Sequence, residues 1–230
     1  NEVSDPFLEP IGKVVGVIRP YVYRNAKAIC ALTKDAAIKI EYKWKFNKVH
    51  VIPIPPAKDV PTPTSWTSRD NIVLSVGRLS HEKGHDILIS AWSLLKNKFP
   101  NWCIKIVGDG PEREKYEKQI EDQDLKNIVD LVGKRLPIWP SYQEAKIFVL
   151  PSRFEGYGIA LVEAMIMGCV CIATETEGPN TIIKNEDNGI LVKTESPEEL
   201  ASTLEGLILD EEKCLKLRKN GMLIREKSKY

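Results

Sequence analysis

One alternation recurs along the chain from residue 71 onward, and it limits the folds open to this sequence. Short apolar, β-branched runs predict strands at 72–76, 103–107, 128–132, 147–150, 170–173 and 190–192. Helical patterns follow at 85–98, 111–120, 141–145, 159–167 and 197–209, the last capped by Ser196, and from 210 onward. Because strands that alternate with helices form parallel sheets covered on both faces, we expect an α/β fold with a doubly wound, Rossmann-like parallel sheet.

The region before residue 70 follows a different pattern. It predicts a helix at 9–23, a strand at 28–33, a helix at 34–44 and a strand at 49–52. Two strands and two helices are too few for an independent core. Five prolines between residues 53 and 63 indicate a stiff connector. We therefore expect residues 1–52 to be a remnant of another domain, 53–70 to be a proline-rich linker, and 71–230 to be the main domain.

The composition excludes several classes of protein. The chain has 33 basic and 32 acidic residues, so it exerts no global attraction on nucleic acid. It lacks the apolar run of about 18 residues that a membrane-spanning helix requires. Its five cysteines are scattered, which is typical of reduced thiols. We therefore expect a cytoplasmic protein that does not bind nucleic acid.

A run of basic and aromatic residues at 39–48 leaves two interpretations of location. It is explained by the solvated end of an amphipathic helix, or by docking on an anionic membrane surface. Peripheral association with the inner face of the membrane therefore stays beside a cytoplasmic location. The chain begins with Asn1, and we expect it to be a fragment of a longer protein.

The first predicted strand of the main domain ends in the loop Gly77-Arg-Leu-Ser-His-Glu-Lys-Gly84. Arg78 offers a planar fork and Lys83 a compact charge for phosphate, and the loop leads into a helix amino terminus that favours anions. The loop has neither the dinucleotide-binding nor the P-loop signature. An ordinary solvated loop is the alternative interpretation.

A second turn, Gly108-Asp-Gly-Pro111, follows the next predicted strand. Gly108 and Gly110 would let a ligand approach the backbone closely, and a purely structural turn is the alternative. The carboxyl ends of parallel strands meet at one edge of a sheet. This turn is therefore expected to lie near the loop of residues 77–84, which we call the cationic loop.

The stretch from Arg153 to Gly168 places two carboxylates where carboxylates are rare. Glu163 lies in the middle of an otherwise apolar helix, and Glu155 precedes that helix. The backbone N–H groups of Gly156, Tyr157 and Gly158 can form an anion nest at the helix amino terminus. Glu163 could accept hydrogen bonds from a ribose diol and Glu155 from sugar hydroxyls. A helix with one solvent-facing glutamate is the alternative.

No metal site is expected from the sequence. Asp122-Gln-Asp124 has the D-x-D form that holds a metal in some sugar transferases, but it falls at a charged helix end. The three histidines do not cluster, and no Ser–His or Cys–His arrangement suggests nucleophilic catalysis.

Taken together, the motifs resemble the nucleotide-binding half of glycosyltransferase family 4, whose members are retaining enzymes of the GT-B fold. The resemblance rests on GRLSHEKG, VGDGP, FVLPSRFEGYGIALVEAMIMG and EGPNTIIKNEDNGILV, in this order, followed by the SPEEL helix. It covers about residues 71–226. The set is specific because the E-x7-E pair, Glu155 and Glu163, occurs together with the G-R-x(4)-K-G loop.

The resemblance implies a role for each motif. Arg78 and Lys83 would bind the donor diphosphate and stabilise the leaving group. Glu155 would contact the donor sugar, Glu163 would hold the ribose, and residues 156–158 would present N–H groups. The family requires no metal or other cofactor. The segment 177–179 is similar to that of transferases for bacterial surface polysaccharides, which implies a UDP-sugar donor and a saccharide or lipid-linked acceptor.

The chain also departs from the family pattern. The GT-B fold has two Rossmann-like domains, and the resemblance implies that residues 1–52 are a remnant of the N-terminal, acceptor-side one. The glycine-rich donor loop and catalytic histidine of the family's first domain have no counterpart, and the family usually ends in a helix that returns to that domain. We therefore expect the chain to bind nucleotide sugar weakly and to turn over little. A sugar-nucleotide epimerase of the GT-B fold and a non-catalytic nucleotide-binding module are the alternatives.

Overall fold

The computed structural model describes residues 25–32, 34–44, 49–52 and 60–227. The chain divides into two compact units, Asn1–Ile54 and Pro55–Tyr230, with the boundary inside the expected proline-rich linker. The helix expected at 9–23 lies outside the described residues.

In the first unit, two parallel strands flank a helix. Strands β1 (Ile29–Ala31) and β2 (Val49–Val51) pair in parallel, and helix α2 (Lys34–Trp44) connects them. Ala31 and Ala37 are buried between these elements, whereas Tyr42 is exposed. Both strands are shorter than expected, and the helix has the expected bounds.

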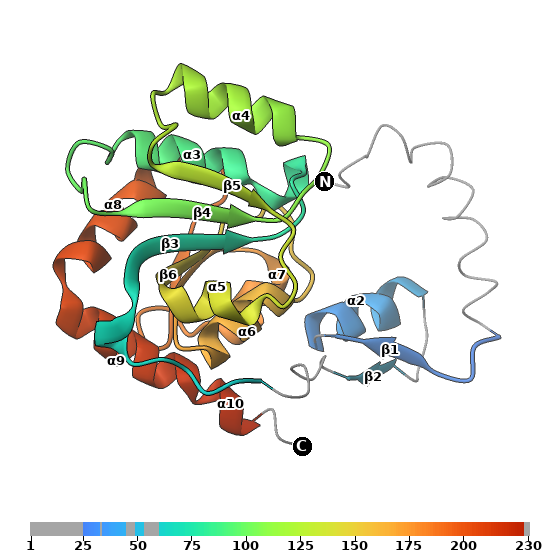
Figure 1. Ribbon diagram of the computed structural model, residues 1–230. Helices are drawn as coiled ribbons and strands as arrows, with labels where there is room; N and C mark the ends of the chain where they lie inside the picture. The colour runs from blue at the N-terminus through green and yellow to red at the C-terminus, as the bar shows by residue number, and fades with distance from the viewer. Residues whose placement is uncertain (1–24, 33, 45–48, 53–59, 228–230) are drawn as a thin grey trace. The chain divides into compact units, whose positions relative to one another are not determined.

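The second unit is built on a six-stranded parallel sheet with the order β5-β4-β3-β6-β7-β8. Figure 1 shows the part of this order that runs from β5 through β4 and β3 to β6. Its strands are β3 (Asp70–Val76), β4 (Cys103–Val107), β5 (Val129–Gly133), β6 (Ala145–Leu150), β7 (Val170–Thr174) and β8 (Ile190–Val192). Every neighbouring pair is parallel. The expected doubly wound sheet is confirmed.

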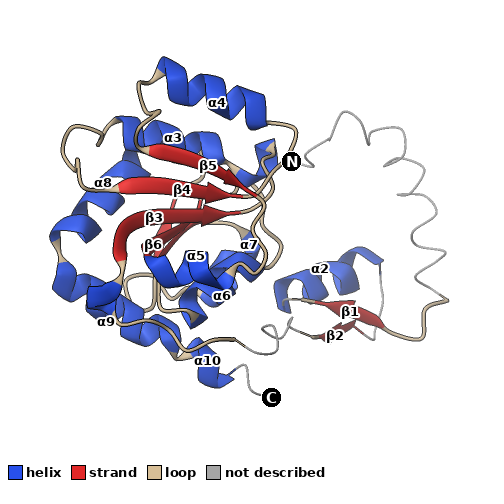
Figure 2. Ribbon diagram, in the orientation of Figure 1, coloured by secondary structure: helices blue, strands red, loops and turns tan. Residues whose placement is uncertain are grey.

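Helices cover both faces of this sheet (Figure 2). They are α3 (His85–Ser93), α4 (Arg113–Asp122), α5 (Trp139–Glu144), α6 (Ile159–Ile166), α7 (Glu177–Ile182), α8 (Pro197–Leu209), α9 (Glu211–Met222) and α10 (Ile224–Lys227). Alternate strand residues point to opposite faces. Val73 packs in the apolar layer beneath α3, α4 and α8, and Leu74 packs in the layer beneath α5 and α6.

Several elements differ from their expected bounds. Helix α3 ends at Ser93, because the following N–H groups of Leu94, Leu95 and Lys98 bond three residues back and tighten the chain into turns. Helix α7 was not predicted, and a short 3-10 helix, η2 (His81–Lys83), lies in the cationic loop. Ser196 occupies the N-cap of α8 without a side-chain cap bond, so the expected cap is wrong in that respect.

The carboxyl-terminal part of the expected linker belongs to the second unit and packs against its other elements. The indole of Trp66, in the 3-10 helix η1 (Trp66–Ser68), donates a hydrogen bond of 2.7 Å to Glu211. Arg69 is 4% exposed and donates to the carbonyl oxygen of Tyr142 over 2.8 Å. The side chain of Thr64 donates to the carbonyl oxygen of Gln143. This segment is therefore part of the core that supports β3.

The strand order reverses beside β3. The chain leaves β3 for β4 and β5 on one side, then returns to β6 on the other side of β3. The loops after β3 and β6 are therefore neighbours at the carboxyl edge of the sheet, which is where doubly wound folds bind ligands.

Candidate functional site

A pocket of about 760 Å³ opens at the carboxyl edge of the sheet. The loops after β3, β4 and β5 form most of its wall, and α6 contributes Glu163. Five residues expected at the site line it: Gly77, Arg78, Gly108, Gly110 and Glu163. The sheet therefore brings residues from four separate segments to one cavity.

The glycines of the second turn are required by contact between two loops. Gly108 has φ +150°, and a Cβ there would lie 1.8 Å from the carbonyl oxygen of Gly77. At Gly110 a Cβ would lie 2.3 Å from the carbonyl oxygen of Leu79. The Leu79 N–H also donates a hydrogen bond of 3.1 Å to the main-chain carbonyl oxygen of Asp109. Backbone packing thus explains these glycines, and the same packing shapes the pocket wall.

Cations gather at the rim of this pocket. The exposed side chain of Arg78 forms no hydrogen bond or ion pair with another residue of the described chain. Lys134 and Arg135, also exposed, line the pocket from the loop after β5 and were not singled out in the sequence. The rule that ligand groups follow the carboxyl ends of strands identifies them, because Gly133 ends β5. The rim therefore offers three cationic groups to an anion.

Lys83 and Glu155 are joined by an ion pair. The Lys83 ammonium lies 2.7 Å from Oε2 of Glu155, and Oε1 accepts a hydrogen bond from the Gly158 N–H at 3.2 Å. The alkyl chain of Lys83 passes 3.6 Å from the position that a Cβ of Gly77 would occupy. The pair thus fastens the loop after β3 to the loop after β6, beside the main pocket.

Glu155 and Gly156 line a second pocket of about 450 Å³. Phe154 and the carboxylates of Glu175 and Glu177 share its wall. Its wall thus combines carboxylates, the Arg153 side chain, two threonines and one aromatic ring, which is the type of surface that hydroxyl-rich ligands use.

Tyr157 belongs to the wall of neither of these two pockets. Its backbone lies against α7, where a Cβ on Gly178 would be 2.4 Å from the Tyr157 carbonyl oxygen. Burial raises the pKa of the Tyr157 phenol. Among residues 156–158, the Gly158 N–H is bonded to Glu155, and Gly156 reaches the second pocket.

Glu163 is half-buried and has a protein donor. The phenol of Tyr142 donates a hydrogen bond of 2.9 Å to its Oε2. Burial raises the pKa of the Glu163 carboxyl, and this hydrogen bond acts in the opposite direction. The carboxylate therefore faces the pocket from an apolar helix with one oxygen already engaged.

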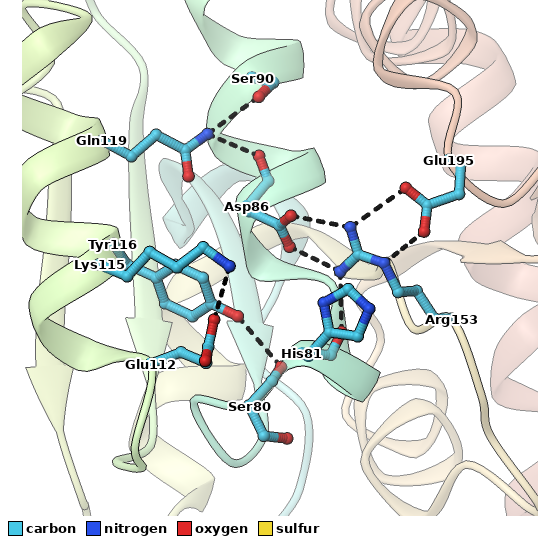
Figure 3. Close-up of polar contacts among 10 residues, drawn as sticks. All are labelled: Ser80, His81, Asp86, Ser90, Glu112, Lys115, Tyr116, Gln119, Arg153 and Glu195. Atoms are coloured by element: carbon cyan, nitrogen blue, oxygen red, sulfur yellow. Dashed lines mark hydrogen bonds and ion pairs between the residues drawn. The ribbon is translucent and has the colours of Figure 1, made fainter. Parts of the chain in front are cut away.

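Arg153 anchors the cationic loop and was not identified from the sequence (Figure 3). Its guanidinium lies between Asp86 and Glu195, with two 2.8 Å hydrogen bonds to Asp86, and it donates to the His81 carbonyl oxygen. The Arg153 N–H donates to the carbonyl oxygen of Glu82 over 2.8 Å. Burial acts to raise the pKa of Asp86, but the hydrogen bonds from Arg153 hold it below its ordinary value. Arg153 therefore fixes both the loop that carries Lys83 and the start of α3.

His85 lies next to Gly77 in the pocket wall, where a Cβ on Gly77 would be 3.5 Å from its Nε2. It is 1% exposed, its Nδ1 lies 3.2 Å from the Ser75 hydroxyl, and its Nε2 has no hydrogen-bond partner in the described structure. Burial lowers the pKa of His85 to about 4, and the Lys83 charge adds to this effect. The imidazole is therefore neutral at physiological pH.

Metal binding and membrane spanning have no support among the described residues. The described residues contain no group of three or more His, Cys, Asp or Glu side chains placed to hold a metal ion. Asp124 instead lies 3.8 Å from Lys96. Within the described part of the chain, no helix has the length and hydropathy needed to cross a bilayer.

Comparison with known proteins places the chain among sugar transferases. A family model, "Glycosyl transferases group 1", matches residues 59–223. An uncharacterized glycosyltransferase of Haemophilus influenzae is 29% identical over 227 residues, which are 98% of this chain and 62% of the relative. An α-1,4-N-acetyl-D-galactosaminyltransferase of Campylobacter jejuni, named for an undecaprenol-diphosphate-linked saccharide, is 27% identical over 90% of this chain and 57% of its own.

The fold has close counterparts among solved structures. Anabaena HepE in complex with UDP and glucose superposes with a TM-score of 0.81 and 22% identity, covering 90% of this chain and 60% of HepE. The chain thus spans less than two thirds of these relatives, and its fold is that of the GT-B glycosyltransferases. Since the family match covers well over half of the residues, this chain belongs to the glycosyl transferases group 1 family.

Proposed function

We propose that the chain is the nucleotide-sugar-binding part of a retaining, family 4 glycosyltransferase. It would move a sugar from a nucleoside-diphosphate donor, a UDP-sugar, to a saccharide or lipid-linked acceptor in polysaccharide or glycoconjugate synthesis. The observation that carries this proposal is the meeting of Arg78, Lys83, Glu155 and Glu163 at one edge of the sheet. An epimerase or a purely binding module is less favoured, because the relatives are named as transferases.

The diphosphate would bind where the loops after β3 and β4 meet. The guanidinium of Arg78, which has no side-chain partner in the described part of the chain, is available to phosphate oxygens, and the glycine backbone lets them approach. Lys83 stands next to Gly77, so its charge would stabilise the leaving phosphate as the glycosidic bond breaks. These cations can supply the charge compensation that a metal gives in other transferases, so we propose that the reaction is metal-independent.

The nucleoside would occupy the main pocket. The Glu163 oxygen that accepts no hydrogen bond from a described residue would accept from the ribose hydroxyls, and Leu136 and Ile138 offer apolar surface to a base. The donor sugar would lie toward Glu155 and Gly156, in reach of the second pocket. In this arrangement the Lys83–Glu155 ion pair would separate the sugar from the nucleoside.

The choice of donor and acceptor rests on relatives. HepE binds UDP and glucose, which supports a UDP-sugar donor. The Campylobacter relative acts on an undecaprenol-linked saccharide, which supports a lipid-linked acceptor. All five cysteines are free thiols. A cytoplasmic site of action, at the inner face of the membrane, is part of the same proposal.

Calorimetric titration tests the proposal directly. We expect UDP to bind more tightly than GDP or ADP, with the same affinity in the presence of EDTA. Absence of binding by all three nucleotides would overturn the proposal. Wherever product forms from UDP-glucose and a lipid-linked saccharide, NMR of that product tests retention, because the new glycosidic bond must keep the anomeric configuration of the donor.

A further inference from the structure

We infer that Tyr142 is a positioning residue that aims the Glu163 carboxylate at the ribose, and so makes the site prefer ribonucleotides over deoxyribonucleotides. This inference rests on the proposed nucleotide site. It concerns a residue whose side chain does not line the pocket and acts only through Glu163.

The geometry supports an orienting role. Tyr142 is fully buried in α5, and its ring is held between Phe148 and Trp139, with ring centroids 5.9 and 6.3 Å away. Its hydroxyl donates to Oε2 of Glu163 over 2.9 Å. A carboxylate fixed at one oxygen by a buried donor presents its other oxygen in a set direction. Oε1 of Glu163 has no hydrogen-bond partner among the described residues, and this oxygen is the one left for a ligand.

Hydrogen bonds from Arg69 fix the backbone near Tyr142 and Glu163. The buried guanidinium of Arg69 donates to the carbonyl oxygens of Tyr142, Ala145 and Met167. The Met167 N–H in turn donates to the Glu163 carbonyl oxygen over 2.9 Å. One cation therefore binds the carboxyl ends of both α5 and α6, where helix dipoles favour positive charge. The tyrosine and the glutamate are thereby kept at a constant separation.

The chemistry of the pair favours the same role. Burial and the Glu163 charge raise the pKa of the Tyr142 phenol well above its ordinary value, so the hydroxyl stays a donor. Burial raises the pKa of Glu163, and the phenol opposes that rise. Removing the hydroxyl would therefore both free the carboxylate to rotate and make it easier to protonate.

The test is calorimetric titration of the full chain with UDP and with 2′,3′-dideoxy-UDP. Wild type should prefer UDP. In Tyr142→Phe, the affinity for UDP should fall about tenfold, as for a lost hydrogen bond to a charged group, and that for the dideoxy compound should not change. In a Glu163→Gln background, Tyr142→Phe should have no further effect. Phenylalanine keeps the packed ring, and circular dichroism verifies folding.

The pH dependence supplies a second readout. The ratio of the two affinities cancels the titration of the phosphate groups. As pH falls, the preference for UDP should disappear at a higher pH in Tyr142→Phe than in wild type. Tyr116→Phe is the matched control: its buried phenol donates to the Ser80 carbonyl oxygen and does not contact Glu163, so the ratio should stay at the wild-type value.

The outcomes separate the two proposals. If wild type binds UDP but Tyr142→Phe keeps the wild-type preference, the positioning role is wrong and the nucleotide site stands. If wild type binds neither compound, the nucleotide site itself is wrong.

Discussion

The ammonium group of Lys83 lies 2.7 Å from the carboxylate of Glu155, although the two residues are 72 positions apart in the sequence. Their side chains are 29% and 13% exposed, so water screens the pair only in part. The contact joins the loop after β3, which lines the main pocket, to the loop after β6, which lines the second pocket. Substitution of Lys83 should therefore lower the affinity for the nucleotide, whereas substitution of Glu155 should lower the affinity that the sugar adds.

We expect Lys83→Met to weaken UDP binding about tenfold, because a charge-assisted contact to phosphate is lost. Glu155→Gln leaves Lys83 in place, so UDP should bind at least as tightly as to wild type. The same variant should lose the additional affinity that UDP-glucose has over UDP. Calorimetry with both ligands checks this, and equal loss of UDP affinity in the two variants would contradict it.

Arg153→Met should destabilise the protein by about 2 to 4 kcal/mol, because it leaves partly buried Asp86 without its guanidinium. Urea denaturation measures this loss. Lys126→Met provides the control: it removes an exposed ion pair with Glu121, so its unfolding free energy should stay close to that of the wild type. A similar loss in both variants would show that the Arg153 contacts are no stronger than surface pairs.

The Arg153 contacts also predict a dependence on pH. The folded-state pKa of Asp86 lies below its ordinary value of 3.8, so the stability it contributes is present above that value. This contribution is lost as pH falls through the folded-state pKa. The difference in unfolding free energy between wild type and Arg153→Met should therefore narrow in strong acid. A constant difference from pH 7 to pH 2 would exclude the ion pair as its source.

His85 should make the protein less stable as pH falls from about 6.5 to about 4. Its pKa is about 4 in the fold and 6.5 ordinarily, so the unfolded chain binds the extra proton in this window. The loss should reach roughly 3 kcal/mol. Denaturation of His85→Asn should show a shallower slope over this range, whereas His81→Gln, at an exposed site of the cationic loop, controls for removal of an imidazole. NMR should find His85 neutral down to about pH 4.

Gly108→Ala should destabilise the fold by about 3 kcal/mol or more, because its methyl group would lie 1.8 Å from the Gly77 carbonyl oxygen. UDP binding should be lost with it, since the two loops must separate. Gly156→Ala is the matched control, because no atom lies within 4 Å of the new Cβ and its backbone N–H is retained. It should change the unfolding free energy by less than about 1 kcal/mol. An equal decrease in the melting temperature of Gly108→Ala and Gly156→Ala would contradict this prediction.

The strands were predictable from the sequence because each is short, apolar and followed by a turn. Cys103–Val107 and Ile190–Val192 have the expected bounds. Helix α7 was missed because its first turn contains Gly178 and Pro179, which normally indicate a loop. Proline is tolerated there because the first turn of a helix has no internal partner for its N–H.

The candidate site was predictable only as a set of loops. Arg78, Gly108 and Glu163 were expected at one edge and do line one pocket. The Lys83–Glu155 pair was not expected, since a contact between residues so far apart depends on β3 and β6 being neighbours. Arg153 was missed for the same reason: its partners come from three other segments.

The reversal of strand order beside β3 also bears on how such a chain can evolve. Apart from Glu163, the main pocket is built by loops on the β3, β4 and β5 side, and the second pocket by loops on the β6 and β7 side, with Thr194. Mutations on one side leave the other scaffold unchanged. Selection can therefore alter the specificity of the main pocket and that of the second pocket separately. The Lys83–Glu155 ion pair, which joins the two sets of loops, can be kept in both cases.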